Sequence, residues 1–251
     1  MPTLAEVIAT LRTDPFKYVV HLKMLDAYAD QMLWYGDEGG VALLLPAAAH
    51  PYDARSYPDA DWIVLLATAQ PDAADRLVAR LPRGPKLVFK LVDELSKAAV
   101  LRAFPAQRVT GFVSYTLPAG DFARDPRVEV ARNLDERLLP FFQANGYTQP
   151  ELEHDFSQGS VSFSLFGDCP LSTCYIFKNY ERIWEIGGVH TAPAYRGQGL
   201  AKVVVAAALG ELLATRRIPR YQVNEANLPS RAVAEGLGMQ PFVFTEHFKN
   251  Y

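Results

Sequence analysis

Cysteine is scarce in this chain of 251 residues, which has only Cys169 and Cys174. Their spacing is not the Cys-x-x-Cys of redox sites, and no other metal-ligating residues cluster beside them. We therefore expect reduced thiols and no metal. Pro170 indicates a turn between the two cysteines, so Cys174 falls in the next strand, where cysteine usually behaves as a small apolar residue. A cysteine nucleophile is disfavoured.

Long apolar runs and an excess of basic residues are also missing. No stretch approaches the roughly 18 to 20 apolar residues that cross a bilayer, and the amino terminus lacks a signal-peptide pattern. The 25 Lys and Arg against 28 Asp and Glu give a formal net charge of -3, which argues against electrostatic binding of nucleic acid. We expect a cytoplasmic enzyme with no nucleic-acid or membrane partner. Whether it forms a homodimer stays open.

The segment from Arg182 to Lys202 reads as an apolar strand, a proline break and a helix that begins in Arg-Gly-Gln-Gly-Leu-Ala. The first N–H groups of a helix have no partner inside it. Gly197 and Gly199 remove side-chain bulk there, so consecutive N–H groups can converge on one anion, which the helix dipole also favours. A pyrophosphate fits such a site. A plain tight turn between strand and helix is the alternative.

The segment is neither a Gly-x-Gly-x-x-Gly fingerprint nor a P-loop. Arg196, Gly199 and Ala201 instead match Arg/Gln-x-x-Gly-x-Gly/Ala, and the segment resembles the GNAT superfamily of N-acetyltransferases. The resemblance implies an acyl-CoA-dependent acyltransferase that uses acetyl-CoA and a small amine. It implies a CoA site made of the end of the strand and the start of the helix: Val189, His190, Thr191, Arg196, Gly197, Gln198, Gly199, Leu200, Ala201 and Lys202.

The carboxyl-terminal stretch extends the resemblance. A strand ending at Asn224 precedes a helix that opens at Asn227 to Ser230 and runs through 237–239, as in the family. Asn224, Asn227 and Ser230 are further CoA-binding candidates. Asn227 also suits a helix N-cap, and one residue can do both.

The pattern departs from the family at Ala234, where many members have a tyrosine that protonates the leaving thiolate. A general acid then comes from another residue or from water. Alternatively none is needed, because a thiolate of pKa about 8.5 is already a fair leaving group.

Glu185 is the candidate general base, because amine acylation needs a neutral nucleophile and this carboxylate lies in an apolar strand where desolvation would raise its pKa. A glutamate at about this offset is the proposed base in the glycine N-acyltransferase-like branch, which the layout resembles. A surface glutamate or an ion-pair partner is the alternative. His190 is the second candidate. Strict alternation puts it on the opposite face from Glu185, but a bulge at Gly187 and Gly188 reverses that phase.

The pattern of elements predicts two domains, 1–120 and 121–251, with a linker at 118–128. The second has the GNAT fold, a mixed, mainly antiparallel sheet with flanking helices, and the first is another mixed α/β domain, in one reading a degenerate GNAT-like half. Expected strands are 41–45, 62–67, 86–92, 108–115, 160–166, 171–177, 182–191, 221–224 and 242–248. Expected helices lie within the first 35 residues and at 71–81, 93–103, 134–144 and 200–212, followed by the helix after Asn227. A loop containing Asp155 is expected after Gly146.

The function that these residues favour is transfer of an acetyl group to a primary amine by direct attack in a ternary complex. A catalytically silent acyl-CoA sensor or an interaction protein is the alternative. Amino acids, other small amines, aminoglycoside-like antibiotics and protein amino termini all remain open as acceptors. Arg182, Arg217 and Arg220 would suit a carboxylated acceptor, although exposed structural charges are the favoured interpretation.

Overall fold

A computed structural model describes residues 2–251. The chain forms two compact units, unit 1 with residues 1–112 and 243–251 and unit 2 with residues 113–242. The domain boundaries expected from the sequence, 1–120 and 121–251, stay a prediction. Among the described residues, no helix has the length and apolar character needed to span a membrane.

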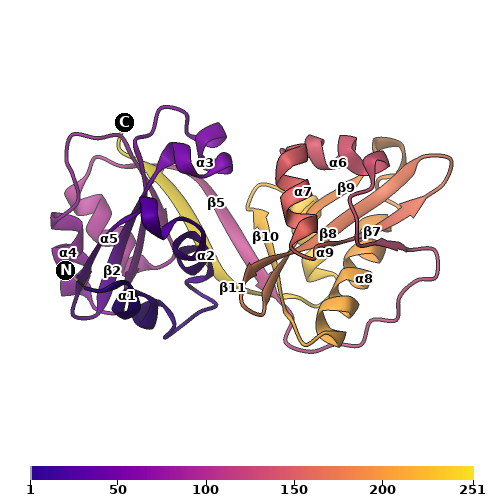
Figure 1. Ribbon diagram of the computed structural model, residues 1–251, viewed down its shortest axis with the longest axis horizontal. Helices are drawn as coiled ribbons and strands as arrows, with labels where there is room; N and C mark the ends of the chain where they lie inside the picture. Colours follow the sequence, from indigo (N-terminus) through magenta and orange to yellow (C-terminus); the bar gives the residue numbers. More distant parts are fainter. Residues whose placement is uncertain (1) are drawn as a thin grey trace. The chain divides into compact units, whose positions relative to one another are not determined.

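Unit 1 is a sheet with helices on both faces (Figure 1). Its elements are α1 (Leu4–Leu11), α2 (Val19–Tyr28), β1 (Leu33–Asp37), β2 (Gly40–Pro46), α3 (Pro51–Ser56), β3 (Trp62–Thr68), α4 (Pro71–Ala79), β4 (Leu87–Leu91), α5 (Glu94–Ala103) and the first part of β5 (Gln107–Thr116). Side chains alternate along β2, so that Ala42 and Leu44 pack under α4 and α5 in one core cluster.

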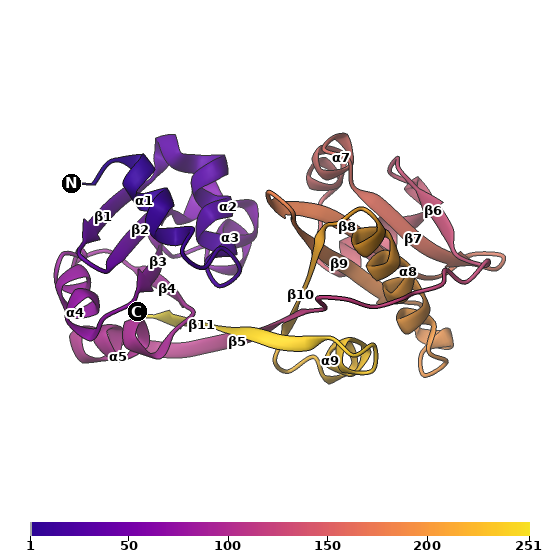
Figure 2. The ribbon, with the colours of Figure 1, turned by 90° about the horizontal axis from the view of Figure 1, so that it is seen from below.

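Unit 2 also has helices on both faces of its sheet (Figure 2). Its elements are β6 (Glu129–Ala131), α6 (Leu139–Ala144), α7 (Gln149–Ser157), β7 (Val161–Phe166), β8 (Pro170–Tyr180), β9 (Ile183–Thr191), α8 (Leu200–Ala214), β10 (Ile218–Asn224), α9 (Leu228–Glu235) and the start of β11 (Gln240–Lys249). One core cluster gathers α8 with Ile176 and Ile186, and another gathers α6 and α7 with Tyr175. The face of the sheet under α6 and α7 is called the α6–α7 face below.

The two units repeat one order of elements, although no repeat stands out in the sequence. In each unit, two helices are followed by three antiparallel strands. A helix then leads to a strand that is parallel to the third strand, and a further helix and a last strand follow. The last strands are exchanged. β11 pairs with β4 of unit 1, while β5 is the neighbour of β10 in unit 2. The mixed, mainly antiparallel sheet with flanking helices is the predicted fold class.

Most predicted elements are present, and the exceptions are short. The helix expected at 134–144 is a 3-10 turn (Glu136–Leu138) followed by α6, with Pro140 in the first turn. The loop expected around Asp155 is α7, which Thr148 and Glu151 begin as a capping box. α9 ends at Glu235 rather than near residue 239. The end of the expected first helical stretch, near Leu33, is β1.

Candidate active site

β9 and β10 part within unit 2 and form a fork. They pair in parallel at Ile183 to Glu185 and Ile218 to Arg220. Beyond these residues β9 continues to Thr191 and β10 to Asn224. The two strands therefore separate beyond Glu185 and Arg220, which are their last paired residues.

A bulge interrupts β9 just beyond the fork, at the glycine pair where the sequence leaves a bulge and strict alternation open. Thr173 pairs with His190 and Tyr175 with Gly187, so Cys174 alone stands opposite Gly188 and Val189. Both glycines are needed. A Cβ on Gly187 would lie 2.6 Å from Tyr147 Oη, while Gly188 has a φ of +61° and would place a Cβ 2.8 Å from the ring of Phe142.

The bulge decides which side chains share a face. Because of it, His190 joins Glu185 and Gly187 on the α6–α7 face, and its ring lies 4.6 Å from that of Phe141. Strict alternation would have separated Glu185 from His190. Burial, and then the charge of Arg196, lowers the pKa of the half-buried His190 below its ordinary value. The imidazole is therefore neutral near pH 7.

Glu185 is buried and accepts three hydrogen bonds. Its Oε1 accepts from the backbone N–H of Gln222 at 2.7 Å, and its Oε2 accepts from Asn179 at 2.7 Å and from Arg220. Glu185 is thus an ion-pair partner of Arg220, which is the alternative interpretation of this glutamate. Arg220 is 3% exposed, so the interpretation of this arginine as a surface charge is wrong.

The loop before α8 has the open backbone that the sequence predicts. Gly197 and Gly199 have φ values of +78° and +76°, and a Cβ on either would meet no atom within 4 Å. The positive φ, rather than crowding, is what requires glycine here. No side chain of the described residues caps α8, so the N–H groups of its first turn face the loop. Lys202 is exposed.

Arg196 joins this loop to the end of β9, because its Nε donates to the carbonyl oxygen of Thr191 at 3.2 Å. The carbonyl oxygen of Val189 accepts from Asn145 at 3.4 Å. The predicted residues on β9 and in the loop are therefore brought together. The other candidates form a second group at the start of α9.

In that second group, Asn227 is the N-cap of α9 and accepts from the N–H of Ser230 at 3.2 Å. The helix-cap interpretation is correct. Asn224, at the end of β10, accepts from the N–H of Ala226 at 2.9 Å. Ala234, at which the sequence departs from the family pattern, is fully buried in the core cluster that includes α8.

Tyr147 is the residue near the fork that the sequence does not point to. It lies between α6 and α7 with its hydroxyl against Gly187, and its ring meets that of Tyr175 edge-on at 5.3 Å. Burial, followed by the charge of Glu185, raises its pKa above the ordinary value. The phenol stays protonated and can donate a hydrogen bond. Only the turn-forming Asn145-Gly146 before it hints at a chain reversal here.

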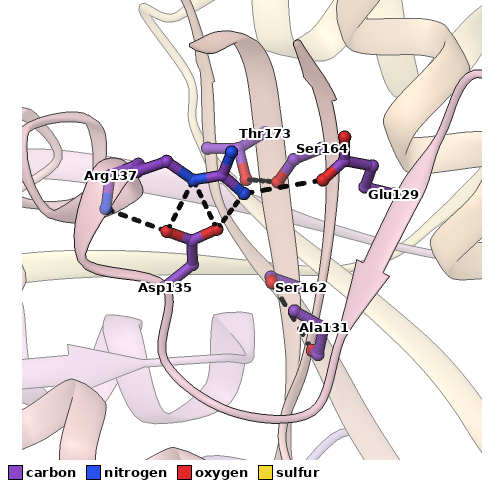
Figure 3. Close-up of polar contacts among 7 residues, drawn as sticks. All are labelled: Glu129, Ala131, Asp135, Arg137, Ser162, Ser164 and Thr173. Atoms are coloured by element: carbon purple, nitrogen blue, oxygen red, sulfur yellow. Dashed lines mark hydrogen bonds and ion pairs between the residues drawn. The ribbon is translucent and has the colours of Figure 1, made fainter. Parts of the chain in front are cut away.

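Small hydroxyl side chains continue the α6–α7 face away from His190. Thr173, the partner of His190, bonds to Ser164 at 2.7 Å, and Glu129 stands opposite Ser164 (Figure 3). Arg137 binds Asp135 at 2.6 Å and Glu129 at 3.5 Å beside this row. Ser162 and Ser164 are 1% and 2% exposed, so this polar face of β7 is buried rather than turned to water.

Neither cysteine belongs to the fork. Cys174 is fully buried in β8, and its thiol lies 3.4 Å from the carbonyl oxygen of Val204, while Cys169 is exposed. Within residues 2–251, no three His, Cys, Asp or Glu side chains lie close enough together to hold a metal ion. The expectation of no metal stays a prediction.

Several solved structures share this arrangement, and some of them are acetyltransferases of the GNAT family. A GNAT-family acetyltransferase from Colwellia psychrerythraea is 11% identical, with TM-score 0.62, over 100% of this chain and 98% of that one. A GCN5-related N-acetyltransferase from Kribbella flavida is 15% identical, with TM-score 0.60, over 93% and 95%. A Drosophila protein is 15% identical, with TM-score 0.65, over 100% and 97%. These likenesses show the fold.

The sequence itself gives a more specific match, although no curated protein matches it. The family model of the acetyltransferase (GNAT) family matches residues 128–239. This range contains the fork, the bulge and the glycine loop before α8. Residues 128–239 are therefore a domain of the GNAT family of acetyltransferases.

Proposed function

We propose that the chain is an acyl-CoA-dependent N-acyltransferase that transfers acetyl from acetyl-CoA to a small primary amine by direct attack in a ternary complex. The observation that carries this proposal is the uncapped start of α8 behind Gly197 and Gly199, close to an open fork of β9 and β10. An uncapped helix start with converging N–H groups suits a pyrophosphate.

The residues fit acetyl-CoA in three places. The N–H groups from Gly197 to Lys202 would bind the pyrophosphate, and the β9 backbone from Val189 through His190 to Thr191 would face the pantetheine arm. Arg196 directly precedes the first site, and Gln198 lies within it. Asn224, Asn227 and Ser230 would support the CoA arm from α9. Acetyl-CoA supplies the acyl group as a thioester.

The amine must lose a proton as the C–N bond forms and the C–S bond breaks. Glu185 is the proposed base. A carboxylate has about four acceptor positions, and three donors leave one for a proton taken directly or through water. His190, neutral and half-buried on the same face, is the second candidate. The leaving thiolate is weakly basic, so the proposed reaction needs no general acid from the protein.

The alternative function is an acyl-CoA sensor without catalysis. Ala234 favours it, because this position of α9 offers no hydroxyl to a leaving thiolate. The two free cysteines suit the reducing cytoplasm that we propose as the location.

Calorimetric titration with acetyl-CoA and CoA, followed by thiol release against a panel of amines, tests the proposal. Binding with amine-dependent release is expected. Binding without release for any amine would favour the sensor. No binding would overturn the assignment of the glycine loop.

A further inference from the structure

Glu185 and Arg220 form a buried ion pair in unit 2, with side chains 8% and 3% exposed. The two residues come from different strands and lie 35 positions apart. Arg220 also donates from Nη2 to Ser114 on β5 at 3.0 Å. Its guanidinium is therefore fixed by two partners from two neighbouring strands.

The position of the pair in the sheet is specific. Glu185 and Arg220 are the last residues that β9 and β10 share before they separate. The Gln222 N–H lies beyond that point on β10, and the carboxylate of Glu185 accepts from it at 2.7 Å. The pair thus lies at the base of the fork. There the Glu185 carboxylate serves the Gln222 N–H as acceptor, in place of the backbone carbonyl that the N–H would lose where the strands separate.

Stability alone is a poor reason for such a pair. Apolar residues of similar volume are often as stabilising as a buried ion pair, or more so. The surroundings are also apolar on both flanks of Glu185, where Trp184 and Ile186 are core residues. A charged pair at the base of the fork therefore points to a role for the charge itself.

We propose that Arg220 is a positioning residue of the reaction, which keeps the Glu185 carboxylate ionised and oriented at the base of the fork. This inference rests on the proposed function, with Glu185 as base. The amine proton passes to Glu185 as the nitrogen bonds to the acyl carbon, and the electron pair of the broken C–S bond leaves on the thiolate. Arg220 takes no proton in this step.

Other titratable groups lie near this carboxylate or are influenced by its charge. Tyr147 approaches from between α6 and α7, and the charge of Glu185 helps to raise its pKa. Tyr221, next to Arg220 on β10, has its pKa raised by burial and to a lesser extent by Glu185. His190 shares the α6–α7 face of β9. Both phenols stay neutral over the pH range of an enzyme assay, so Arg220 is the charged partner that contacts the Glu185 carboxylate.

The test is the pH profile of kcat/KM for Arg220→Met and Arg220→Lys. Without the guanidinium, a buried carboxylate favours its proton, so the acidic limb of Arg220→Met is expected at least about one pH unit higher than in the wild type. At pH 7 its rate falls about tenfold or more. Arg220→Lys keeps the charge and is expected to restore the limb to within about half a unit.

Arg127→Met is the matched control, because it removes an arginine from an exposed pair with Asp125. It is expected to leave the profile unchanged. A lower rate with an unmoved limb in both Arg220 variants would overturn the positioning role. If Arg220→Met shows no cooperative melt, Ser114→Ala decides, because it removes the second partner that fixes the guanidinium. A limb and a carboxyl titration that both stay unmoved in Ser114→Ala contradict the proposal.

A readout without catalysis separates this inference from the proposed function. The carboxyl carbon of Glu185, followed by NMR in protein labelled at glutamate, is expected to titrate at higher pH in Arg220→Met than in the wild type. If it does so while no amine is acetylated, the pairing holds and the proposed function fails. If thiol release is normal but the titration does not move, the positioning role fails and the transferase stands.

Discussion

Two histidines of unit 1 are buried with neutral rings. His21 is fully buried, and its Nε2 lies 3.0 Å from the carbonyl oxygen of Leu66. His247 is 4% exposed, and its Nδ1 is hydrogen-bonded to the hydroxyl of Tyr57 at 2.6 Å. Burial lowers the pKa of His21 to about 4 and, with the charge of Lys90, that of His247 to about 3. Both side chains therefore resist protonation in the folded chain.

These pKa values predict that the protein loses stability as pH falls below about 6.5. In the unfolded chain both rings gain a proton near pH 6.5, whereas in the folded chain they do so only near pH 4 and 3. At pH 5 each ring then costs about 2 kcal/mol of folding free energy. Urea unfolding at pH 7 and pH 5 measures the loss.

His154 is the control for this prediction, because it is exposed on α7. His154→Gln is expected to keep the full pH dependence, and His247→Gln to reduce it. Equal stability at pH 7 and pH 5 in the wild type would show that the two rings are not buried as described.

The sequence places residues on strands but not beside their partners. Glu185 lies on the strand that the sequence predicts, and the bulge at Gly187 and Gly188 is one of the two alternatives that the glycine pair leaves open. Arg220 was not predicted as the partner of Glu185, because the contact depends on how two strands 35 residues apart come into register. Tyr147 carries no motif, and only its fold position brings it to Gly187.

At the scale of elements, α8 and α4 occupy equivalent places in the two units but differ at their amino ends. α8 begins after Gly197 and Gly199 with no acidic residue in its first turn. α4 begins with Pro71 after Gln70 and has Asp72 in its first turn. A carboxylate at a helix start competes for the positive end of the dipole, and proline removes an N–H group. The start of α4 therefore does not suit a pyrophosphate.

We accordingly expect one CoA per chain, held by α8. Gly199→Ala is expected to weaken CoA binding about tenfold, because a Cβ at positive φ costs about 1 to 2 kcal/mol and shifts the loop. Calorimetric titration gives both the stoichiometry and the affinity. Gly84→Ala is the matched control, since a Cβ there meets no atom within 4 Å. A stoichiometry of two, or an unchanged affinity in Gly199→Ala, would contradict this reading of the two helices.

Elements with a strong local signal were predicted and weak ones were not. The apolar period from Leu200 specifies α8, which runs to Ala214. α7 was missed although Thr148 and Glu151 form a capping box, because its apolar positions are few. β6 has three residues, Glu129 to Ala131, and its extended conformation depends on pairing with β7. Such a strand is defined by its neighbour rather than by its own sequence.

At the scale of the whole molecule, the exchanged strands predict how the chain can be divided. The fragment 121–251 lacks Tyr115 and Leu117, which belong to the core of unit 2, and contains β11 without its partner β4. The fragment 113–242 keeps that core intact. We expect 113–242 to melt cooperatively and 121–251 to aggregate or melt without a transition. Circular dichroism melts and gel filtration measure this.

An equally cooperative melt of 121–251 would show that β5 is dispensable and would support the boundary expected from the sequence. The sequence could not reveal the exchange. Both β5 and β11 read as ordinary strands, and a strand pattern does not state which neighbour it pairs with.

The exchange of strands also determines the order in which the parts of the sheet can form while the chain is being synthesised. Domains usually fold one after another as the chain leaves the ribosome, the amino-terminal one first. Here β4 ends at Leu91, but its antiparallel partner begins at Gln240. The amino-terminal half thus emerges with β4 lacking that neighbour, and the nascent chain closes the unit 1 sheet only after nearly all of unit 2 has been translated.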